Sequence, residues 1–293
     1  MTPRSVLRRA PVLLVLVAVA SGSAACGGDG ARATSAVAAP ATTGTPGSAG
    51  GAAPAGVATI DLRSEIDHVH GLAVGAAGDV LAGTHSGVVR LGTDGSVEPV
   101  GRSRDDFMGM TGDPDTGRLW SSGHPGRGSD LPDPVGLLVS DDGGVTWRPV
   151  SLTGDVDFHA LGASGDRVVG SGGPAGLLVS EDGGRSWREG PALAAAAIVV
   201  AGDEVWATTA DGVQHSTDGG FSFRPVPDAP PLVLLSRAAD GSMWGIDETG
   251  VAWRSPVGGG WESRAVVGAV EAMVAAGPDL AYAVRDGKLL ELT

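Results

Sequence analysis

Cysteine is almost absent from this sequence. Cys26 is the only one in 293 residues, so no intramolecular disulfide can stabilise the fold. Long apolar runs are also missing. The run Val12–Ala20 has nine residues and Ala192–Val200 is equally short, whereas a helix that crosses a bilayer needs about 20. We therefore expect no membrane-spanning helix, and Ala192–Val200 fits a buried strand better.

Basic residues are scarce as well. The chain has 20 Lys and Arg against 34 Asp and Glu, a net charge of −14. Such a surface repels phosphate backbones, which excludes nucleic acid as a partner. Glycine is frequent, at 49 residues, but it has no three-residue period, which excludes collagen. Because 42% of residues are hydrophobic, disorder of the whole chain is excluded too.

The first 25 residues have the pattern of a signal peptide. Charged, apolar and small residues follow one another there: Arg4, Arg8 and Arg9, then Val12–Ala20, then Ser21–Ala25. Residues 23–26, Ser-Ala-Ala-Cys, resemble the bacterial lipobox, which implies a lipid on Cys26 and a protein exported to the cell envelope and anchored to its membrane. Leucine is usual where Ser23 stands, so ordinary cleavage near Ala25 is the alternative.

The segment after Cys26 is a linker. Of the 30 residues in Gly27–Gly56, 27 are Gly, Ala, Pro, Ser or Thr. Such a segment has almost nothing to bury, so folding cannot offset the entropy of ordering it. As a flexible coil it would hold a domain roughly 30 Å from its anchor. Residues 26–56 are thus predicted to tether a folded domain over residues 57–293.

This domain contains a repeated octet. It occurs as Ser140–Trp147, Ser180–Trp187 and Ser216–Phe223, with the pattern Ser-x-Asp-Gly-Gly-x-Ser/Thr-Trp/Phe. The spacings of 40 and 36 residues are those of four-stranded propeller blades. The octets resemble the Asp-box (BNR repeat) of sialidases, sortilins and photosystem II assembly factors, with degenerate copies at Thr93–Gly95 and Ser255–Trp261. The resemblance implies structural turns between the third and fourth strands of each blade.

Alignment on the octets predicts an all-β, six-bladed β-propeller. The inner strands are expected at His70–Val74, Phe107–Thr111, Phe158–Gly162, Ala196–Val200, Leu232–Ser236 and Val270–Ala275. The second strands are expected at Val80–Thr84, Arg118–Ser122, Arg167–Ser171, Glu204–Thr208, Ser242–Ile246 and Leu280–Val284. Blade six lacks its outer strand, which the alternating segment Val57–Arg63 would supply. Closure of the ring removes exposed sheet edges, and we expect a monomer.

Five of the six histidines fall on one face of this propeller, the face opposite the octets. They stand where inner strands begin or second strands end, together with a thioether and two carboxylates: His68, His70, His85, His124 and His159, with Met108, Asp106 and Asp157. Imidazoles with a thioether suit copper, and imidazoles with carboxylates suit zinc, iron or nickel. This face is predicted to bind a metal ion, copper first and zinc second. A polar small molecule or a peptide is the alternative ligand, and ordinary turn contacts explain any single histidine.

A further resemblance covers Val57–Thr293. Segments such as His68–Val74, Asp105–Gly109 and Asp157–Leu161 are similar to exported bacterial propellers labelled glycosyl hydrolase or sialidase-like. That resemblance implies the alternative of an exo-sialidase-like glycoside hydrolase, with arginines that grip a carboxylate, a tyrosine nucleophile and acidic partners. Its candidates here are Arg104, Arg127, Arg285, Tyr282, Glu271, Asp105 and Asp106.

The sequence contains barely enough of the residues that a sialidase site needs. The arginine-Ile-Pro motif of that family is also missing near the first blade. The sequence therefore favours a non-catalytic binding module, with the glycoside hydrolase as the alternative. An assembly or scaffold factor that binds an envelope protein is the second alternative.

Overall fold

The structure is a computed structural model that describes residues 56–172 and 176–293. These ranges contain strands, turns and loops but no helix, and hence no helix that could cross a bilayer. The predicted signal peptide, the lipidation at Cys26 and the linker up to residue 55 lie outside the described residues.

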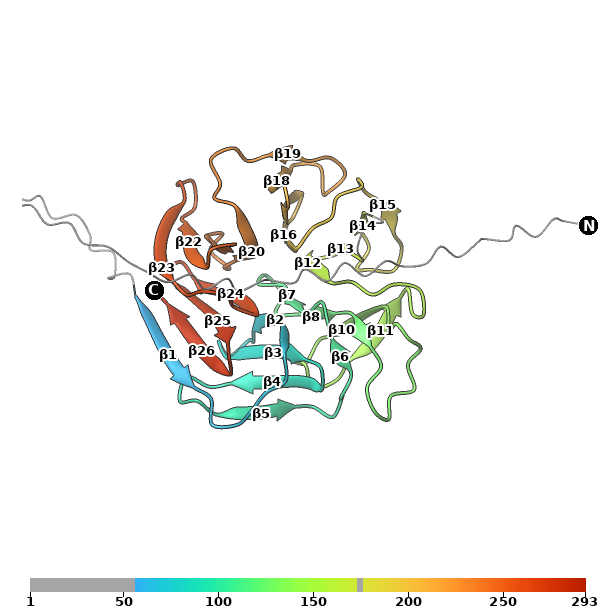
Figure 1. Ribbon diagram of the computed structural model, residues 1–293. Coiled ribbons are helices and arrows are strands. Elements are labelled where there is room, and N and C mark those ends of the chain that lie inside the picture. The colour runs from blue at the N-terminus through green and yellow to red at the C-terminus, as the bar shows by residue number, and fades with distance from the viewer. Residues whose placement is uncertain (1–55, 173–175) are drawn as a thin grey trace, which may run out of the picture. The chain divides into compact units, whose positions relative to one another are not determined.

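The described chain forms six four-stranded antiparallel sheets around a common centre (Figure 1). Blade one contains β2 (Val69–Val74), β3 (Val80–Thr84), β4 (Gly87–Leu91) and β5 (Val97–Val100). Blade two contains β7 (Thr111–Gly112), β8 (Leu119–Ser121), β10 (Leu137–Ser140) and β11 (Arg148–Ser151). Blade three contains β12 (Ala160–Ser164), β13 (Arg167–Ser171), β14 (Leu177–Ser180) and β15 (Arg188–Glu189).

The other three blades repeat this order. Blade four contains β16 (Ala197–Ala201), β17 (Glu204–Thr209), β18 (Gly212–Ser216) and β19 (Arg224–Pro225). Blade five contains β20 (Leu232–Arg237), β21 (Met243–Asp247), β22 (Val251–Ser255) and β23 (Glu262–Val266). Blade six contains β24 (Ala272–Gly277), β25 (Leu280–Arg285), β26 (Lys288–Leu292) and β1 (Val57–Asp61). The predicted all-β six-bladed propeller is confirmed.

The N-terminal strand closes the ring, as the sequence predicted. β1 pairs with β26 in antiparallel register from Val57 opposite Leu292 to Asp61 opposite Lys288. Gly56 and Thr293 extend this ladder with two backbone hydrogen bonds of 2.9 and 3.0 Å. Blade six therefore combines three strands from the C-terminus with one from the N-terminus, and no strand edge is left open at the joint.

Blade two departs from the prediction. Its inner strand was expected at Phe107–Thr111 but begins only at Thr111, and a separate two-stranded ribbon pairs β6 (Asp106–Phe107) with β9 (Gly123–His124). The chain bends between the two strands because Gly109 passes against blade three, where a Cβ on Gly109 would lie 2.1 Å from the carbonyl oxygen of Phe158. The ribbon places Asp106 directly opposite His124.

The octets form tight turns at one end of the strands. In the first octet, Gly144 N–H donates to Ser140 Oγ over 2.8 Å, and Thr146 Oγ donates to Asp142 over 2.6 Å. The glycines of the three octets have φ between 70° and 99°, a conformation that glycine adopts without strain. The Trp147 ring packs on Phe107, with 4.8 Å between ring centroids. These hydrogen bonds and the ring contact hold the first octet as a turn.

The octets also predict how stability depends on pH. Hydrogen bonds from Ser186, through its side chain and its backbone, and from Ser180 lower the pKa of Asp182 to about 2. A carboxylate with a depressed pKa stabilises the fold above its unfolded pKa, and this contribution is lost as the pH falls towards about 2. We expect the octet carboxylates to contribute a nearly constant amount to the melting temperature from pH 7 to 5, and we expect this contribution to be lost between about pH 4 and 2.

The variant Asp182→Asn isolates this contribution. It should melt a few degrees below the wild type at pH 7 and lose less stability in acid, as measured by circular dichroism. Asp228→Asn, in an exposed loop before β20, should follow the wild-type profile. An acid profile of Asp182→Asn identical to that of the wild type would contradict the assignment.

Candidate functional site

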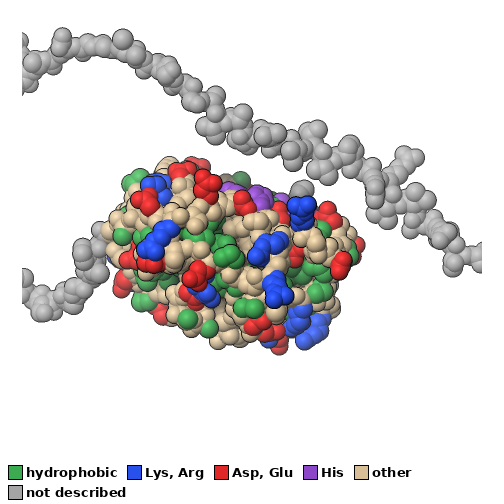
Figure 2. Space-filling model, turned by 90° about the horizontal axis from the view of Figure 1, so that it is seen from below, with side chains coloured by type: hydrophobic (Ala, Val, Ile, Leu, Met, Phe, Trp, Pro, Cys, Tyr) green, Lys and Arg blue, Asp and Glu red, His purple; other side chains and the backbone are tan. Residues whose placement is uncertain are grey.

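The histidines lie at the opposite end of the strands from the octets. His159 directly precedes β12. The turn at the other end of β12 contacts the second octet, because Gly183 N donates a 2.8 Å hydrogen bond to Asp166 O. Figure 2 shows histidine side chains gathered on one side of the molecule. We call this side the histidine face and the other the octet face. The predicted separation of the two faces is confirmed.

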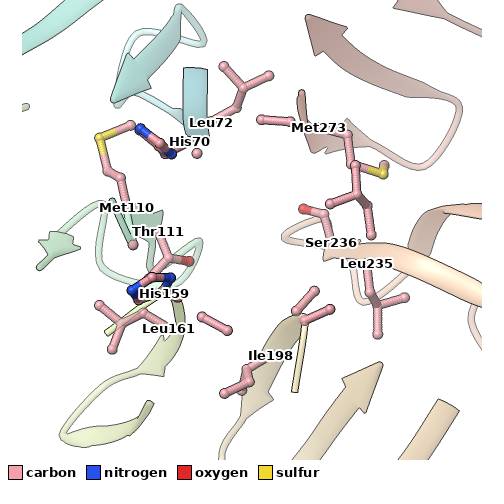
Figure 3. A pocket seen from close by; sticks show the side chains of 17 residues that line it. His70, Leu72, Met110, Thr111, His159, Leu161, Ile198, Leu235, Ser236 and Met273 are labelled. Carbon is pink, nitrogen blue, oxygen red and sulfur yellow. The ribbon is translucent and has the colours of Figure 1, made fainter. Parts of the chain in front are cut away.

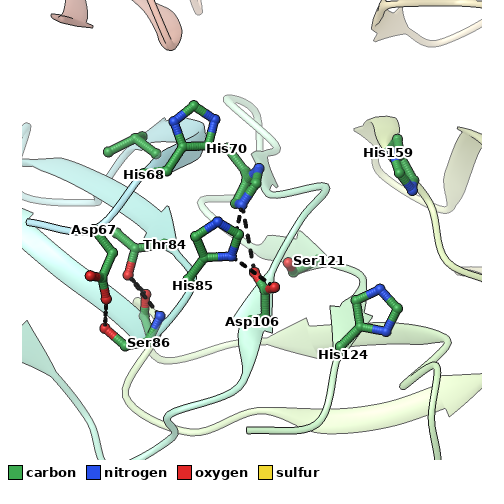
Figure 4. A network of polar contacts seen from close by, with 12 residues as sticks. Asp67, His68, His70, Thr84, His85, Ser86, Asp106, Ser121, His124 and His159 are labelled. Carbon is green, nitrogen blue, oxygen red and sulfur yellow. Dashed lines mark hydrogen bonds and ion pairs between the residues drawn. The ribbon is translucent and has the colours of Figure 1, made fainter. Parts of the chain in front are cut away.

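Three side chains of the histidine face converge on one point (Figure 4). His70 Nε2 lies 3.3 Å from His85 Nδ1 and 3.6 Å from Asp106 Oδ1. His85 Nδ1 lies 2.9 Å from Asp106 Oδ2. Within residues 56–172 and 176–293, this is the one group of three His, Cys, Asp or Glu residues whose ligand atoms all lie within 4.8 Å of one another.

These separations match those between donor atoms around a transition metal. With bonds of about 2.0–2.2 Å to imidazole nitrogen or carboxylate oxygen, neighbouring donors stand about 2.9–3.5 Å apart in octahedral or tetrahedral geometry. The group can therefore hold a metal ion with little rearrangement, through two imidazoles and one carboxylate. Three protein ligands leave further coordination positions open.

The electrostatics of the group favour a cation. Asp106 Oδ1 is buried without a hydrogen-bond partner, and such an oxygen is costly unless a positive group approaches it. Burial and the neighbouring His85 lower the pKa of His70. His70 is thus held towards its neutral form, the form of imidazole that binds metals.

A β-bulge directs the His70 side chain towards His85 and Asp106. Val69 pairs with Thr84 and Gly71 pairs with Gly83, so His70 is the unpaired residue between them. Bulges redirect side chains in this way. Gly71 is required beside it, because a Cβ there would lie 2.4 Å from Met110 O. The sequence contained His70 and Gly71, but periodicity alone does not locate a bulge.

His68 flanks the group and is held by blade six. Its Nδ1 lies 2.9 Å from Glu271 Oε2, and the same oxygen accepts a 2.9 Å hydrogen bond from Val69 N. The His68 ring stands 4.8 Å from the His70 ring, edge to face. Ring closure therefore brings Glu271 to the site as expected, but as the partner of His68.

A second cluster lies beside the first. His159 Nε2 lies 2.8 Å and His124 Nε2 lies 3.4 Å from Asp157 Oδ2. His124 Nδ1 is 2.6 Å from Asp133 Oδ1. These contacts raise the pKa of both imidazoles, chiefly through the hydrogen bond to Asp133 for His124 and to Asp157 for His159. The histidines thus form two groups instead of the single set that we expected.

A cavity of about 110 Å³ opens on the axis between the inner strands (Figure 3). His70 and His159 line one side of it, and Leu235 and Met273 line the other. The methionine of blade two in its wall is Met110, not the predicted Met108. Met108 was predicted because the inner strand of blade two was expected to begin four residues before Thr111, where it does begin. The blade-two thioether that lines the cavity is therefore that of Met110.

The sialidase candidates do not come together. Tyr282 is buried on β25, and its hydroxyl lies 3.4 Å from Glu291 instead of meeting Glu271. Arg285 donates to Val267 O, and Arg104 donates to Ser103 O over 2.6 Å. Asp105 accepts hydrogen bonds from Ser103 Oγ and Gly126 N, which fixes the loop. Among the described contacts, none joins Arg127 to these residues.

His215, the histidine outside the pattern, has a structural environment. It stacks on Trp206, with 4.6 Å between ring centroids and 13° between planes, and pairs with Glu204. Its position on β18 of blade four makes it a useful control for the histidine face.

Comparison with known proteins supports the fold. No family model and no curated protein matches the chain. Similar solved structures include three that cover 81–82% of it: a gluconolactonase from Xanthomonas campestris (TM-score 0.57, 13% identity, 98% of that chain), virginiamycin B lyase from Staphylococcus aureus (0.55, 14%, 99%) and YCF48 bound to a D1 peptide (0.51, 15%, 96%). These propellers include enzymes and a peptide-binding protein, so the likeness does not select an activity.

Proposed function

We propose that this protein is a propeller that binds a divalent transition-metal ion on its histidine face, through His70, His85 and Asp106, without catalysing a reaction. One observation carries the proposal: two imidazole nitrogens and a carboxylate meet at ligand spacing around a buried carboxylate oxygen that has no hydrogen-bond partner. Structural ion pairs normally satisfy such an oxygen.

The donor set indicates which metal binds. Two imidazoles and a carboxylate suit Cu²⁺, Zn²⁺, Fe²⁺ or Ni²⁺, whereas the thioether that would favour Cu⁺ is not part of the group. Affinity for nitrogen and oxygen donors rises along the first-row series to Cu²⁺ and falls at Zn²⁺. We therefore expect Cu²⁺ to bind more tightly than Zn²⁺, with both occupying the same site. The predicted preference for copper is retained, now for Cu²⁺.

A metal titration tests the proposal. Metal-free protein should take up Zn²⁺ and Cu²⁺, measured by calorimetry and by metal analysis after dialysis. The double variant His70→Ala/His85→Ala should lose one bound ion per chain, because two of three donors are gone. His215→Ala should bind as the wild type does. Equal metal content in the wild type and the double variant, with both folded by circular dichroism, would refute the proposed site.

The binding of a partner protein is the alternative that the sequence left open. The similarity to YCF48 in complex with a D1 peptide is a likeness of fold, and no contact of the described residues selects a peptide over a metal ion. The binding of a partner protein therefore stays a prediction.

A further inference from the structure

We propose that the histidine face holds a second metal site, formed by His124 Nε2, a carboxylate oxygen of Asp157 and His159 Nε2. This site goes beyond the one built on His70, His85 and Asp106 and shares no ligand with it. The proposal rests on the aim of the two imidazoles, on the carboxylate behind His124 and on the unsatisfied oxygen of Asp157.

Both imidazoles point at the same carboxylate. The distances to Asp157 Oδ2, 2.8 Å from His159 Nε2 and 3.4 Å from His124 Nε2, again lie close to the separations of about 2.9–3.5 Å expected between neighbouring ligands of one ion. The three donors do not all come within 4.8 Å of one another, unlike those of the first site. The side chains of His124 and His159 are 45% and 63% exposed, so an ion can reach both from solvent, and the more exposed His159 ring can turn onto it while Asp133 holds His124.

A second carboxylate orients His124. Asp133 Oδ1 lies 2.6 Å from His124 Nδ1, which leaves Nε2 on the side of Asp157. Metal-binding histidines usually donate their other ring N–H to a carboxylate in this way, which fixes the tautomer and makes the ligand more basic. Asp133 belongs to the loop between β9 and β10, so this loop has a defined role in the proposal: it positions one ligand.

Asp157 is fixed and incompletely satisfied. Its side chain is only 15% exposed, and its Oδ1 is buried without a partner. The following residue, Phe158, is fully buried, and its N–H donates to Ser122 Oγ over 2.9 Å. The carboxylate therefore cannot easily turn towards water. Asp106 Oδ1 in the first site also lacks a hydrogen-bond partner, so two carboxylates on one face each have one oxygen without a hydrogen bond.

The two sites are neighbours. Asp106 of the first site and His124 of the second face each other across the β6–β9 ribbon, and His70 and His159 line the same axial cavity. The histidine face is thus a pair of adjacent ion sites beside one opening. This arrangement gives four of the five histidines a place as a ligand, while His68 pairs with Glu271.

Metal stoichiometry tests the second site. We expect two Zn²⁺ ions per wild-type chain after loading and dialysis, measured by mass spectrometry of the metal and, for Co²⁺, by its visible absorption. His124→Ala/His159→Ala and His70→Ala/His85→Ala should each retain one ion, and the quadruple variant should retain none. Asp133→Asn should weaken the binding of one of the two ions by about 10–100-fold, because His124 then loses the partner that orients it.

The outcomes separate this proposal from the first. One ion in the wild type that is lost in His70→Ala/His85→Ala and kept in His124→Ala/His159→Ala would overturn the second site and leave the proposed function standing. One ion with the reverse pattern would overturn the first site and support the second. Absence of bound ions from folded wild-type protein would overturn both.

Discussion

Replacement of Asp106 by asparagine is expected to lower the affinity of the first site for Zn²⁺ at least about 100-fold, because removal of even an outer partner of a metal ligand costs about 10–100-fold. The melting temperature of the metal-free protein should stay the same or rise. In the metal-free state the carboxylate is partly buried and one of its oxygens has no hydrogen-bond partner. The neutral amide therefore removes an unfavourable charge, and its oxygen can still accept a hydrogen bond from His85 Nδ1. Opposite effects on metal binding and on stability distinguish a binding residue from a structural one.

Thermal unfolding with and without Zn²⁺ measures both effects. A ligand at 100 times its Kd stabilises the folded state by about 2.7 kcal/mol, which raises the melting temperature by about 5–10 °C for a domain of this size. The first site should contribute this rise in the wild type, and Asp106→Asn should lose that contribution at the same Zn²⁺ concentration while it keeps the part that comes from the second site.

Asp105→Asn is the matched control. Asp105 is the neighbouring residue, but its carboxylate accepts hydrogen bonds from Ser103 Oγ and Gly126 N at 2.7 and 2.8 Å. This variant should melt at a lower temperature without metal and keep its response to Zn²⁺. If Asp106→Asn behaved as Asp105→Asn does, Asp106 would be a structural residue and the first site would fail.

Deletion of Val57–Asp61 should destabilise the domain by about 5 kcal/mol or more. This figure combines the lost burial of the partly buried Ile60, at most about 1.5–3 kcal/mol, with the lost backbone hydrogen bonds to β26, about 0.5–1.5 kcal/mol each. Domains are stable by only about 5–15 kcal/mol, so much of the population should unfold. The exposed edge of β26 should also make the variant prone to aggregation.

Urea unfolding and size-exclusion chromatography measure these effects. Deletion of residues 30–50 in the predicted linker is the control, and it should leave the unfolding midpoint unchanged because this segment has almost nothing to bury. Equal unfolding midpoints for the wild type and the strand deletion would show that β1 does not hold the ring closed.

The sequence located most of the fold because the octets fix the register. The second strands β3 and β13 begin and end at the predicted residues, and β1 pairs with β26 as proposed. The prediction failed for the inner strand of blade two, because the start of that strand depends on the contact between Gly109 and Phe158 of another blade. No local pattern encodes a contact between residues so far apart in the chain.

The candidate site was predicted in outline only. Alternation and topology place five histidines on one face, but the partner of each one depends on the β6–β9 ribbon and on the bulge at His70. Both are tertiary features. The pairing of Glu271 with His68 needs ring closure, and the role of Asp133 needs the path of a loop, so neither could be assigned from spacing.

The pairing of β1 with β26 fixes where the first and last residues of the propeller lie. Gly56 and Thr293 join at the place where blade six would carry its turn between the third and fourth strands, the place that octets occupy in blades two to four. Both ends of the propeller therefore lie on the octet face, on the side away from the imidazoles. A probe or a solid support attached at Thr293 would leave the histidine face open to solution.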